Sequence, residues 1–152
     1  VGFSAQGKFE GSYYRRTAES RAPDLAWMFE GIEDQEILGD FGFSGGGAAG
    51  FELDRADVRL GTPEEVRVVA SSENHTSSFV LVPEEMLTHI TNWPGEEEQQ
   101  KLIRSDIVYF RTPSGGEVFS TGSITFCGSL PWNNFDNNIS RLLENVIRRF
   151  LQ

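Results

Sequence analysis

The fold of this chain depends on the stretch GGGAAGFELDR, residues 45–55. Its first half is rich in glycine, which adopts backbone conformations closed to other residues and allows two backbones to approach closely. Its second half, Phe51–Asp54, alternates apolar and acidic residues, a pattern that predicts a strand with both carboxylates on one side and both apolar side chains on the other. The stretch therefore predicts a backbone held in unusual turns that leads directly into a strand.

The same glycines match the dinucleotide-binding pattern G-x-G-x-x-G at residues 45–50. That motif needs a strand before it, a helix after it and an acidic residue about 20 positions later. Here a strand is predicted after the glycines, and Ala70 occupies the position where the acidic residue is needed. We therefore interpret the run as a tight crossing that lets the backbone pass under another element.

Short apolar runs predict further strands outside this stretch. The run VRVVA is β-branched and typical of a central strand, and the turn sequence TPSGG at 112–116 lies between two apolar runs, which predicts a hairpin. The strands predicted outside the glycine stretch cover residues 26–29, 66–70, 79–82, 106–111 and 117–121.

Two helices and two loops complete the predicted order of elements. Pro83 and two glutamates open a helix over 84–91. Residues 138–151 carry apolar side chains at helical spacing, which predicts an amphipathic helix. Residues 8–22, apart from a short extended piece, and 94–101 are interpreted as loops because they are polar and contain no clear period.

Composition limits the kinds of protein that this chain can be. Its 152 residues, 38% of them hydrophobic, can bury one ordinary core, so we expect a single domain over 1–152. The first residue is Val1, and no signal-peptide pattern follows it, so we expect a fragment of a longer chain, and the single cysteine favours a reducing cytoplasm. A net charge of -10 argues against a nucleic-acid partner, and no apolar run approaches the ~18 residues of a membrane helix.

Glu52 is the first candidate for a site residue. Two carboxylates on one strand face, directly after residues without side-chain bulk, can line a pocket in which desolvation raises the pKa of a general base. The alternative is a solvated strand face with Asp54 and Arg55 in a surface ion pair. Spacing alone leaves both interpretations open.

His75 and Asn133 are secondary candidates. His75 follows the predicted 66–70 strand, where α/β sheets place ligand-binding loops, and it is either a proton shuttle or a bystander. Asn133 belongs to a cluster of four asparagines and one aspartate before the last helix. Such side chains either orient an amide substrate or cap the helix and build turns. The single cysteine, Cys127, excludes an internal disulfide and is interpreted as structural.

A series of short motifs occurs in order along the chain: YYRRT at 13–17, FEGI at 29–32, GDFG at 39–42, GGGAAGFELDR at 45–55, LGTP at 60–63, ASS at 70–72, TPSGG at 112–116 and CGSLPWNNFDNN at 127–138. Together they resemble the C-terminal part of the large (beta) subunit of the N,N-dimethylformamidase family. That family hydrolyses N-substituted amides to an amine and formate. Its large subunit pairs with a small subunit and holds a mononuclear iron through tyrosines and a glutamate.

The resemblance implies a fold, a site and partners. It implies an α/β fold, in which a mixed sheet with a β-hairpin and flanking helices forms part of a class I glutamine amidotransferase-like domain. The iron ligands of the family lie upstream, so no metal ligand and no cofactor are expected in this chain, although Tyr13, Tyr14 and Glu73 are of the right types. Implied partners are a small amide substrate, the small subunit and homo-oligomer contacts, and Glu52 is the implied acid or base. The alternative function is a non-catalytic binding or assembly module.

Overall fold

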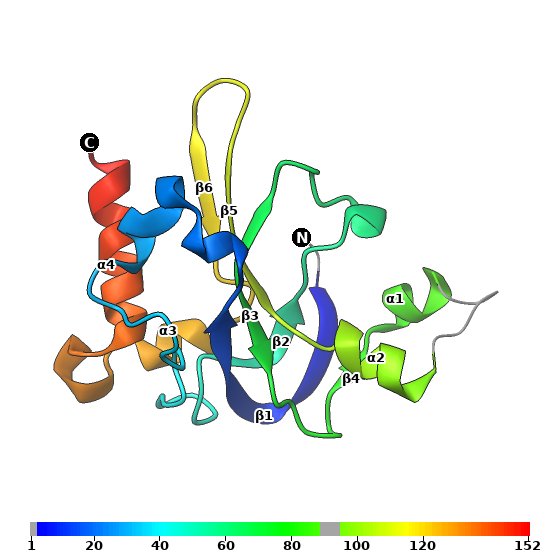
Figure 1. Ribbon diagram of the computed structural model, residues 1–152. Coiled ribbons are helices and arrows are strands. Elements are labelled where there is room, and N and C mark those ends of the chain that lie inside the picture. The colour runs from blue at the N-terminus through cyan, green and yellow to red at the C-terminus, as the bar shows by residue number, and fades with distance from the viewer. Residues whose placement is uncertain (1–2, 89–94) are drawn as a thin grey trace.

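A single curled antiparallel sheet organises the molecule (Figure 1), whose computed structural model describes residues 3–88 and 95–152. The sheet has six strands in the order β2-β1-β3-β5-β6, with β4 also paired to β1. Each of its pairings is antiparallel. The strands are β1 (Phe3–Arg16), β2 (Ala49–Asp54), β3 (Arg67–Glu73), β4 (Val80–Leu81), β5 (Asp106–Arg111) and β6 (Glu117–Ser120).

β1 is the long strand around which the sheet curls. It pairs with β2 between Phe3 and Ser12 and with β4 at Ala5 and Gln6, and its last four residues, 13–16, pair with β3. The chain after β6 then returns to β2, where the Asp54 amide donates to the Gly122 carbonyl at 2.8 Å and Leu53 forms a bridge with Ser123. The two edges therefore approach each other, and the sheet forms a half-barrel around a buried core that includes Ala5, Tyr14 and Leu53.

The glycine run crosses β1 at very close range, as the sequence indicates. A Cβ atom on Gly47 would lie 2.4 Å from the Ser12 carbonyl oxygen, and one on Gly11 would lie 2.3 Å from the Gly47 carbonyl oxygen. The Gly11 amide donates to the Gly45 carbonyl at 2.7 Å. No side chain fits between the two backbones, so these glycines are needed for the crossing and not for a phosphate.

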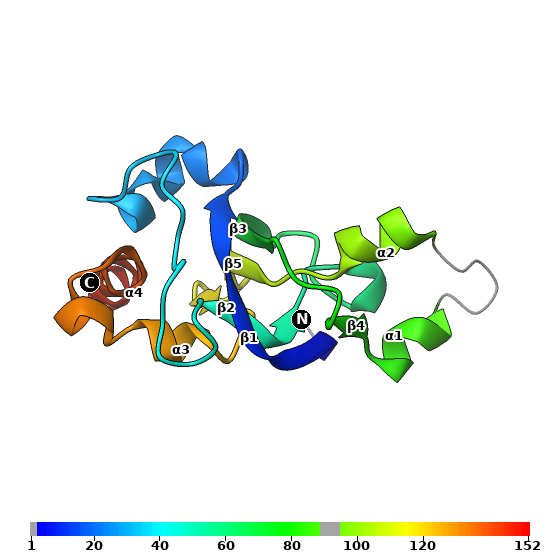
Figure 2. The same ribbon diagram turned by 90° about the horizontal axis from the view of Figure 1, so that it is seen from below.

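The helices lie at the two ends of the sheet (Figure 2). At one end are α1 (Pro83–Thr88) and α2 (Glu96–Leu102), together with the 3-10 turn η3 (Val58–Leu60). At the other end are α3 (Phe126–Ser129) and α4 (Asn138–Phe150), which pack with the 3-10 helix η2 (Pro23–Phe29). Two further 3-10 turns are η1 (Glu19–Arg21) and η4 (Trp132–Phe135). Within the described ranges, no helix is long and apolar enough to cross a membrane.

The α1–α2 end is held by buried charges around Arg55. The Arg55 guanidinium is 1% exposed and donates to Glu85 at 2.5 Å, to Asp57 at 3.0 Å and to the Leu102 carbonyl at 3.3 Å. It therefore connects the end of β2 to both α1 and α2. Hydrogen bonds from Arg59 and Arg55 lower the pKa of Asp57, so this carboxylate stays ionised. The predicted surface pair of Asp54 with Arg55 is wrong, since Arg55 points inward.

The end that carries α4 is held by apolar packing. Of the six apolar side chains predicted at helical spacing, the structure buries only Ile139, Leu142 and Val146. Leu143 is half-buried, and Ile147 and Phe150 are exposed. Asn137 caps the helix by accepting from the Ser140 amide at 2.8 Å. The helix therefore has a buried stripe against the core and a second apolar stripe on its outer side.

The predicted α/β, amidotransferase-like fold class is wrong. Such a fold needs parallel strands joined by crossover helices that cover both faces of the sheet. Here each sheet pairing is antiparallel, so the sheet is not mixed, and the helices lie at the ends of the sheet. The β5–β6 hairpin and the strands at β2, β3 and β4 are confirmed.

Three local predictions fail for identifiable reasons. Residues 8–22 were predicted as a loop but contain most of β1, because the strand buries polar Ser12 beside Tyr14. The strand predicted at 26–29 is part of η2, whose buried Leu25, Met28 and Phe29 follow a helical spacing. The loop predicted at 94–101 contains α2, a helix with no buried residue. The predicted helix 84–91 begins as α1, and its end lies outside the described residues.

Candidate functional site

Glu52 lies on the outward-facing side of β2. It pairs with Gln6 of β1, and both side chains are exposed. The neighbouring pair, Leu53 and Ala5, is fully buried on the other face. Within the described part of the chain, the Glu52 carboxylate makes no hydrogen bond and no ion pair. Its environment in this structure is that of a solvated carboxylate at the outside of the half-barrel.

Asp54 lies two residues later on the same strand and is half-buried. Burial raises the pKa of the Asp54 carboxyl, and the nearby Glu52 carboxylate raises it further. This interaction agrees with the predicted placement of both carboxyl groups on one side of the strand. Two neighbouring carboxyls with different environments can divide acid and base roles between them. The alternation of residues 51–54 contained this signal, but Asp54 was not chosen as a candidate.

Phe51 interrupts the regular alternation of β2. Its φ of 61° lies in the left-handed region, which is unusual for a bulky side chain. The β1–β2 register shifts at this point, where Gln6 pairs with Glu52 and Gly11 pairs with Gly50. Phe51 therefore turns outward and meets Phe9 edge to face, with ring centroids 5.6 Å apart. Both rings are exposed, so the prediction that Phe51 and Leu53 share one apolar face is wrong.

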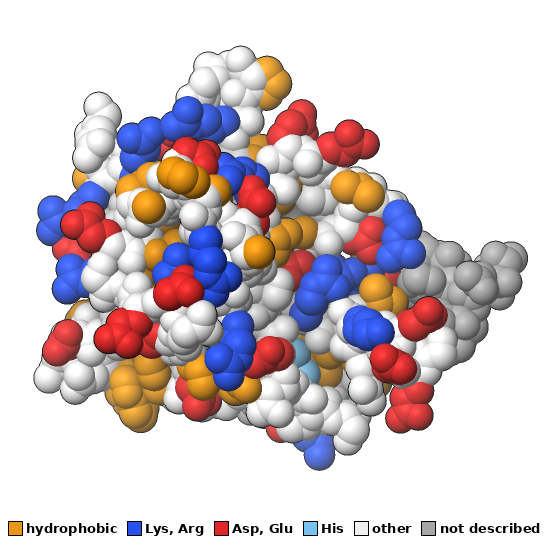
Figure 3. Space-filling view, viewed as in Figure 1, with side chains coloured by type: hydrophobic (Ala, Val, Ile, Leu, Met, Phe, Trp, Pro, Cys, Tyr) orange, Lys and Arg blue, Asp and Glu red, His pale blue; other side chains and the backbone are white. Residues whose placement is uncertain are grey.

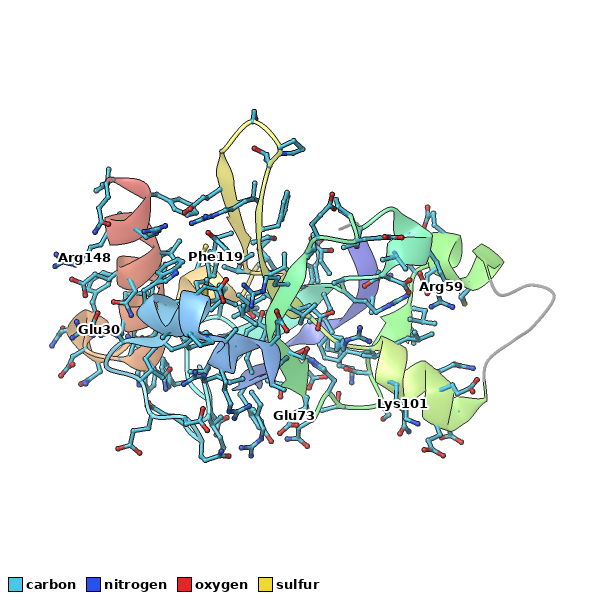
Figure 4. The ribbon with its side chains drawn as sticks, turned by 45° about the horizontal axis from the view of Figure 1, so that its top comes forward. Glu30, Arg59, Glu73, Lys101, Phe119 and Arg148 are labelled. Atoms are coloured by element: carbon cyan, nitrogen blue, oxygen red, sulfur yellow. The ribbon has the colours of Figure 1, made fainter. Side chains whose placement is uncertain are left out.

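His75 lines a cleft of about 680 Å³ between the end of β3 and α2. Figure 4 shows Glu73 and Lys101, which lie on these two elements and also line the cleft. The His75 Nε2 atom is 2.6 Å from the Ser72 hydroxyl, and its ring packs 4.8 Å from the Phe79 ring. Burial lowers the pKa of His75 to about 4, with a small opposing effect from Glu10. The imidazole is therefore neutral near pH 7.

A buried hydrogen-bond chain holds the ring of His75. The Ser105 amide donates to the Ser72 hydroxyl at 2.7 Å, and the same hydroxyl lies 2.6 Å from His75 Nε2. The other ring nitrogen, Nδ1, is buried and has no hydrogen-bond partner among the described residues. The chain continues from Ser105 to the Tyr14 hydroxyl at 2.9 Å. Ser72 is 5% exposed, so it orients His75 and is not placed to attack a substrate.

Tyr14 is not suited to be a metal ligand here. Its hydroxyl donates to the Thr121 carbonyl at 2.8 Å, and burial raises its pKa, so the phenol stays protonated. Glu73 is paired with Arg15 at the surface. In the described ranges, no three histidine, cysteine, aspartate or glutamate side chains gather closely enough to hold a metal ion. Tyr14 and Glu73, two of the three residues of suitable type, are therefore both engaged in other contacts here.

Asn133 lies in the η4 turn before α4. Residues Asn133, Asn134 and Phe135 all have positive φ, at 51°, 55° and 66°. The Asn133 side chain donates to the Asp136 carbonyl at 3.0 Å. Asn137 caps α4 and also donates to the Trp132 carbonyl at 2.7 Å. The amide groups that make hydrogen bonds here shape the turn and the helix start.

The structure does not bring the three candidate residues together. Glu52 lies on the outside of β2, His75 lies in the cleft beside α2, and Asn133 lies in the turn before α4. The cleft that His75 lines includes neither Glu52 nor Asn133 among its lining residues. A site built on Glu52 therefore needs further residues to line it.

Charges of both signs are interspersed on the face seen in Figure 3.

Comparisons with known proteins agree with the motifs. Residues 1–138 match the family model described as N,N-dimethylformamidase beta subunit-like, C-terminal. The chain is 40% identical over 152 residues to the N,N-dimethylformamidase beta subunit of Paracoccus aminophilus. It is 39% identical over the same length to the beta subunit of that name from an Alcaligenes species. All of this chain is covered in both cases, but it spans only 20% of the length of each relative.

Proposed function

This chain belongs to the N,N-dimethylformamidase beta subunit-like, C-terminal family, and we propose that it is the C-terminal portion of the large subunit of an amide hydrolase. The substrate class is N-substituted formamides, which are cleaved to an amine and formate. The single observation that carries the proposal is the 40% identity over the whole chain to a beta subunit of that name. A small subunit and further copies of the large subunit are the proposed partners, in the cytoplasm.

In this proposal, Glu52 contributes the acid or base of the reaction. Amide hydrolysis needs a group that takes a proton from the attacking water and delivers one to the leaving nitrogen. Glu52 is free of internal partners in the described structure, so its carboxylate is available for both transfers. Asp54, whose pKa is raised by burial and further by the Glu52 carboxylate, lies two residues away on the same strand. The iron is proposed to lie in the part of the subunit outside this stretch and to polarise the amide carbonyl.

Glu52→Gln in the full large subunit tests this role. We expect turnover of N,N-dimethylformamide to fall by about 10²–10⁴-fold, the usual contribution of a general acid or base, with unchanged iron content. Glu64→Gln is the matched control, because Glu64 is another exposed glutamate that precedes β3. Full activity of Glu52→Gln would remove Glu52 from the mechanism.

A second function, a non-catalytic assembly module, is favoured by the exposure of Glu52. A carboxylate that stays solvent-facing in the complete protein has no desolvated environment for acid or base work. The two functions differ in one measurement, the iron content and formamide hydrolysis of the full large subunit. Iron without hydrolysis, or neither, would favour assembly.

A further inference from the structure

One side of the sheet near β2 is exposed although it carries apolar side chains. A row of paired residues crosses three strands here, in which Gln6 of β1 pairs with both Glu52 of β2 and Val80 of β4. Directly paired residues on antiparallel strands point to the same face. The next row, Leu53, Ala5 and Leu81, is buried on the inner face. We call the exposed set the β1–β2 face: Gln6, Phe9, Phe51, Glu52 and Val80.

The apolar members of this face are highly exposed. Phe9 is 63% exposed and Val80 is 54% exposed. Phe51 adds a third apolar side chain, which packs against Phe9. Contiguous apolar side chains at the surface, rimmed by polar residues, are typical of interaction sites. The rim here consists of the Gln6 amide and the Glu52 carboxylate.

The backbone of Phe51 shows that this exposure is enforced. A left-handed conformation at a non-glycine residue is strained and persists only where the surroundings impose it. The neighbouring Gly50 packs so closely on Glu10 that a Cβ would lie 2.1 Å from the Glu10 carbonyl oxygen. The crossing therefore turns an aromatic ring away from the core and toward solvent. Among the described residues, the aromatic ring that Phe51 meets is that of Phe9.

The length of the relatives identifies what covers this face. The chain spans 20% of each relative, so four fifths of those subunits lie outside the stretch described here. Domains of one chain commonly pack on each other through interfaces of about 600–1,500 Å². The β1–β2 face offers that larger part apolar anchors directly beside Glu52, the residue whose site lacks walls in this chain.

We propose that the β1–β2 face is the docking surface for the preceding part of the same large subunit, with Phe9, Phe51 and Val80 as apolar anchors that close the site around Glu52. The inference rests on the proposed function for the role of Glu52, but the docking itself does not require catalysis. The segment that docks is expected to present apolar side chains to the two rings and a hydrogen-bond donor to Glu52.

Carbene footprinting read by mass spectrometry tests the docking. The 152-residue chain and the full large subunit are labelled under the same conditions, without substrate. We expect labelling of Phe9, Phe51 and Val80 to fall several-fold in the full subunit. Equal labelling in both proteins would overturn the proposal. A fall that already occurs in the 152-residue chain as its concentration is raised would assign the face to a second copy and would also overturn it.

A pair of variants sharpens the result. Phe9→Asp in the full subunit is expected to restore the labelling of Phe51 and Val80 to the level of the isolated chain. Phe43→Asp is the matched control, because Phe43 is 70% exposed and packs on Trp132, away from this face; it is expected to leave that labelling unchanged. An inactive subunit with a protected face would contradict the hydrolase alone. An active subunit with an unprotected face would contradict the docking alone.

Discussion

The two ends of the sheet are held by opposite kinds of interaction. At the α1–α2 end, the buried Arg55 guanidinium joins Asp57, Glu85 and a backbone carbonyl. At the α4 end, Leu142 and its neighbours pack on the core through buried apolar side chains, and the ion pair between Arg149 of α4 and Glu117 of β6 is partly exposed. Buried ion pairs demand one geometry and are costly when broken, whereas apolar packing contributes stability with less directional demand. The comparison indicates that buried ion pairs fix the arrangement of the α1–α2 end, whereas apolar side-chain packing fixes the arrangement of the α4 end.

Removing the buried guanidinium is expected to have the largest effect. Arg55→Met leaves Glu85 and Asp57 buried without their shared cation, so the free energy of unfolding should fall by about 3–5 kcal/mol. Arg59→Met is the control, because Arg59 also binds Asp57 but its side chain is 62% exposed; a loss within about 1 kcal/mol is expected. Urea unfolding measures both. Equal losses would mean that burial does not distinguish the two arginines.

The inner stripe of α4 is the next test. Leu142→Ala removes a fully buried side chain and should cost about 2–5 kcal/mol. Leu143→Ala, one position along the same helix and only half-buried, should cost clearly less in the same urea experiment. A larger cost at Leu143 would show that the outer stripe is the one that packs in solution.

The glycine crossing lies between the two ends of the sheet. A larger residue there should lower the stability, because its Cβ would clash with the neighbouring backbone. Gly11→Ala places a Cβ 2.3 Å from the Gly47 carbonyl oxygen and should destabilise by roughly 1–3 kcal/mol, the usual cost of overpacking. Gly95→Ala is the comparison, because a Cβ there has no heavy atom within 4 Å and the position precedes α2. Thermal unfolding of the two variants should differ; equal melting temperatures would refute the tight crossing.

Acid is expected to lower the stability least, through His75 in the cleft beside α2. The pKa of His75 lies near 4 in the folded chain, below its ordinary value of 6.5, so the unfolded chain binds the proton first. Stability from His75 is therefore complete above pH 6.5 and is lost as the pH falls toward 4, by ~1 kcal/mol at about pH 5.5. His75→Gln should flatten this part of the stability curve measured by urea unfolding. An unchanged slope would show that His75 is not the group responsible.

Much of the local structure could be predicted because it depends on neighbours in the chain. The TPSGG turn between apolar runs correctly predicts the β5–β6 hairpin, and the apolar period of 138–151 correctly predicts α4. The glycine run correctly predicts a close backbone crossing. The prediction failed at β1 because Ser12, a polar residue on a buried face, breaks the apolar alternation by which strands are recognised.

The candidate site could be predicted only in part. The Phe51–Asp54 pattern identified a strand with two carboxyls, but not that Phe51 turns outward or that Asp54 is the half-buried one of the two. The position of His75 after a strand indicated a possible site, but the orientation of its ring depends on Ser72, whose hydroxyl accepts from the Ser105 amide, 33 residues farther along the chain. Burial and hydrogen bonding are set by segments far apart in sequence, which spacing does not describe.

The sequence by itself determined the turns, the glycine crossing, the terminal helix and the family, because each depends on short patterns of residues. Only the tertiary structure decided that the sheet is antiparallel and curled, that Arg55 is buried and that Glu52 is exposed. Those outcomes depend on which strands meet and which side of each strand faces the core. A short run of residues has the same local preference for a strand in a parallel and in an antiparallel sheet. The choice between these two sheets is therefore made when the strands pair and the core is buried.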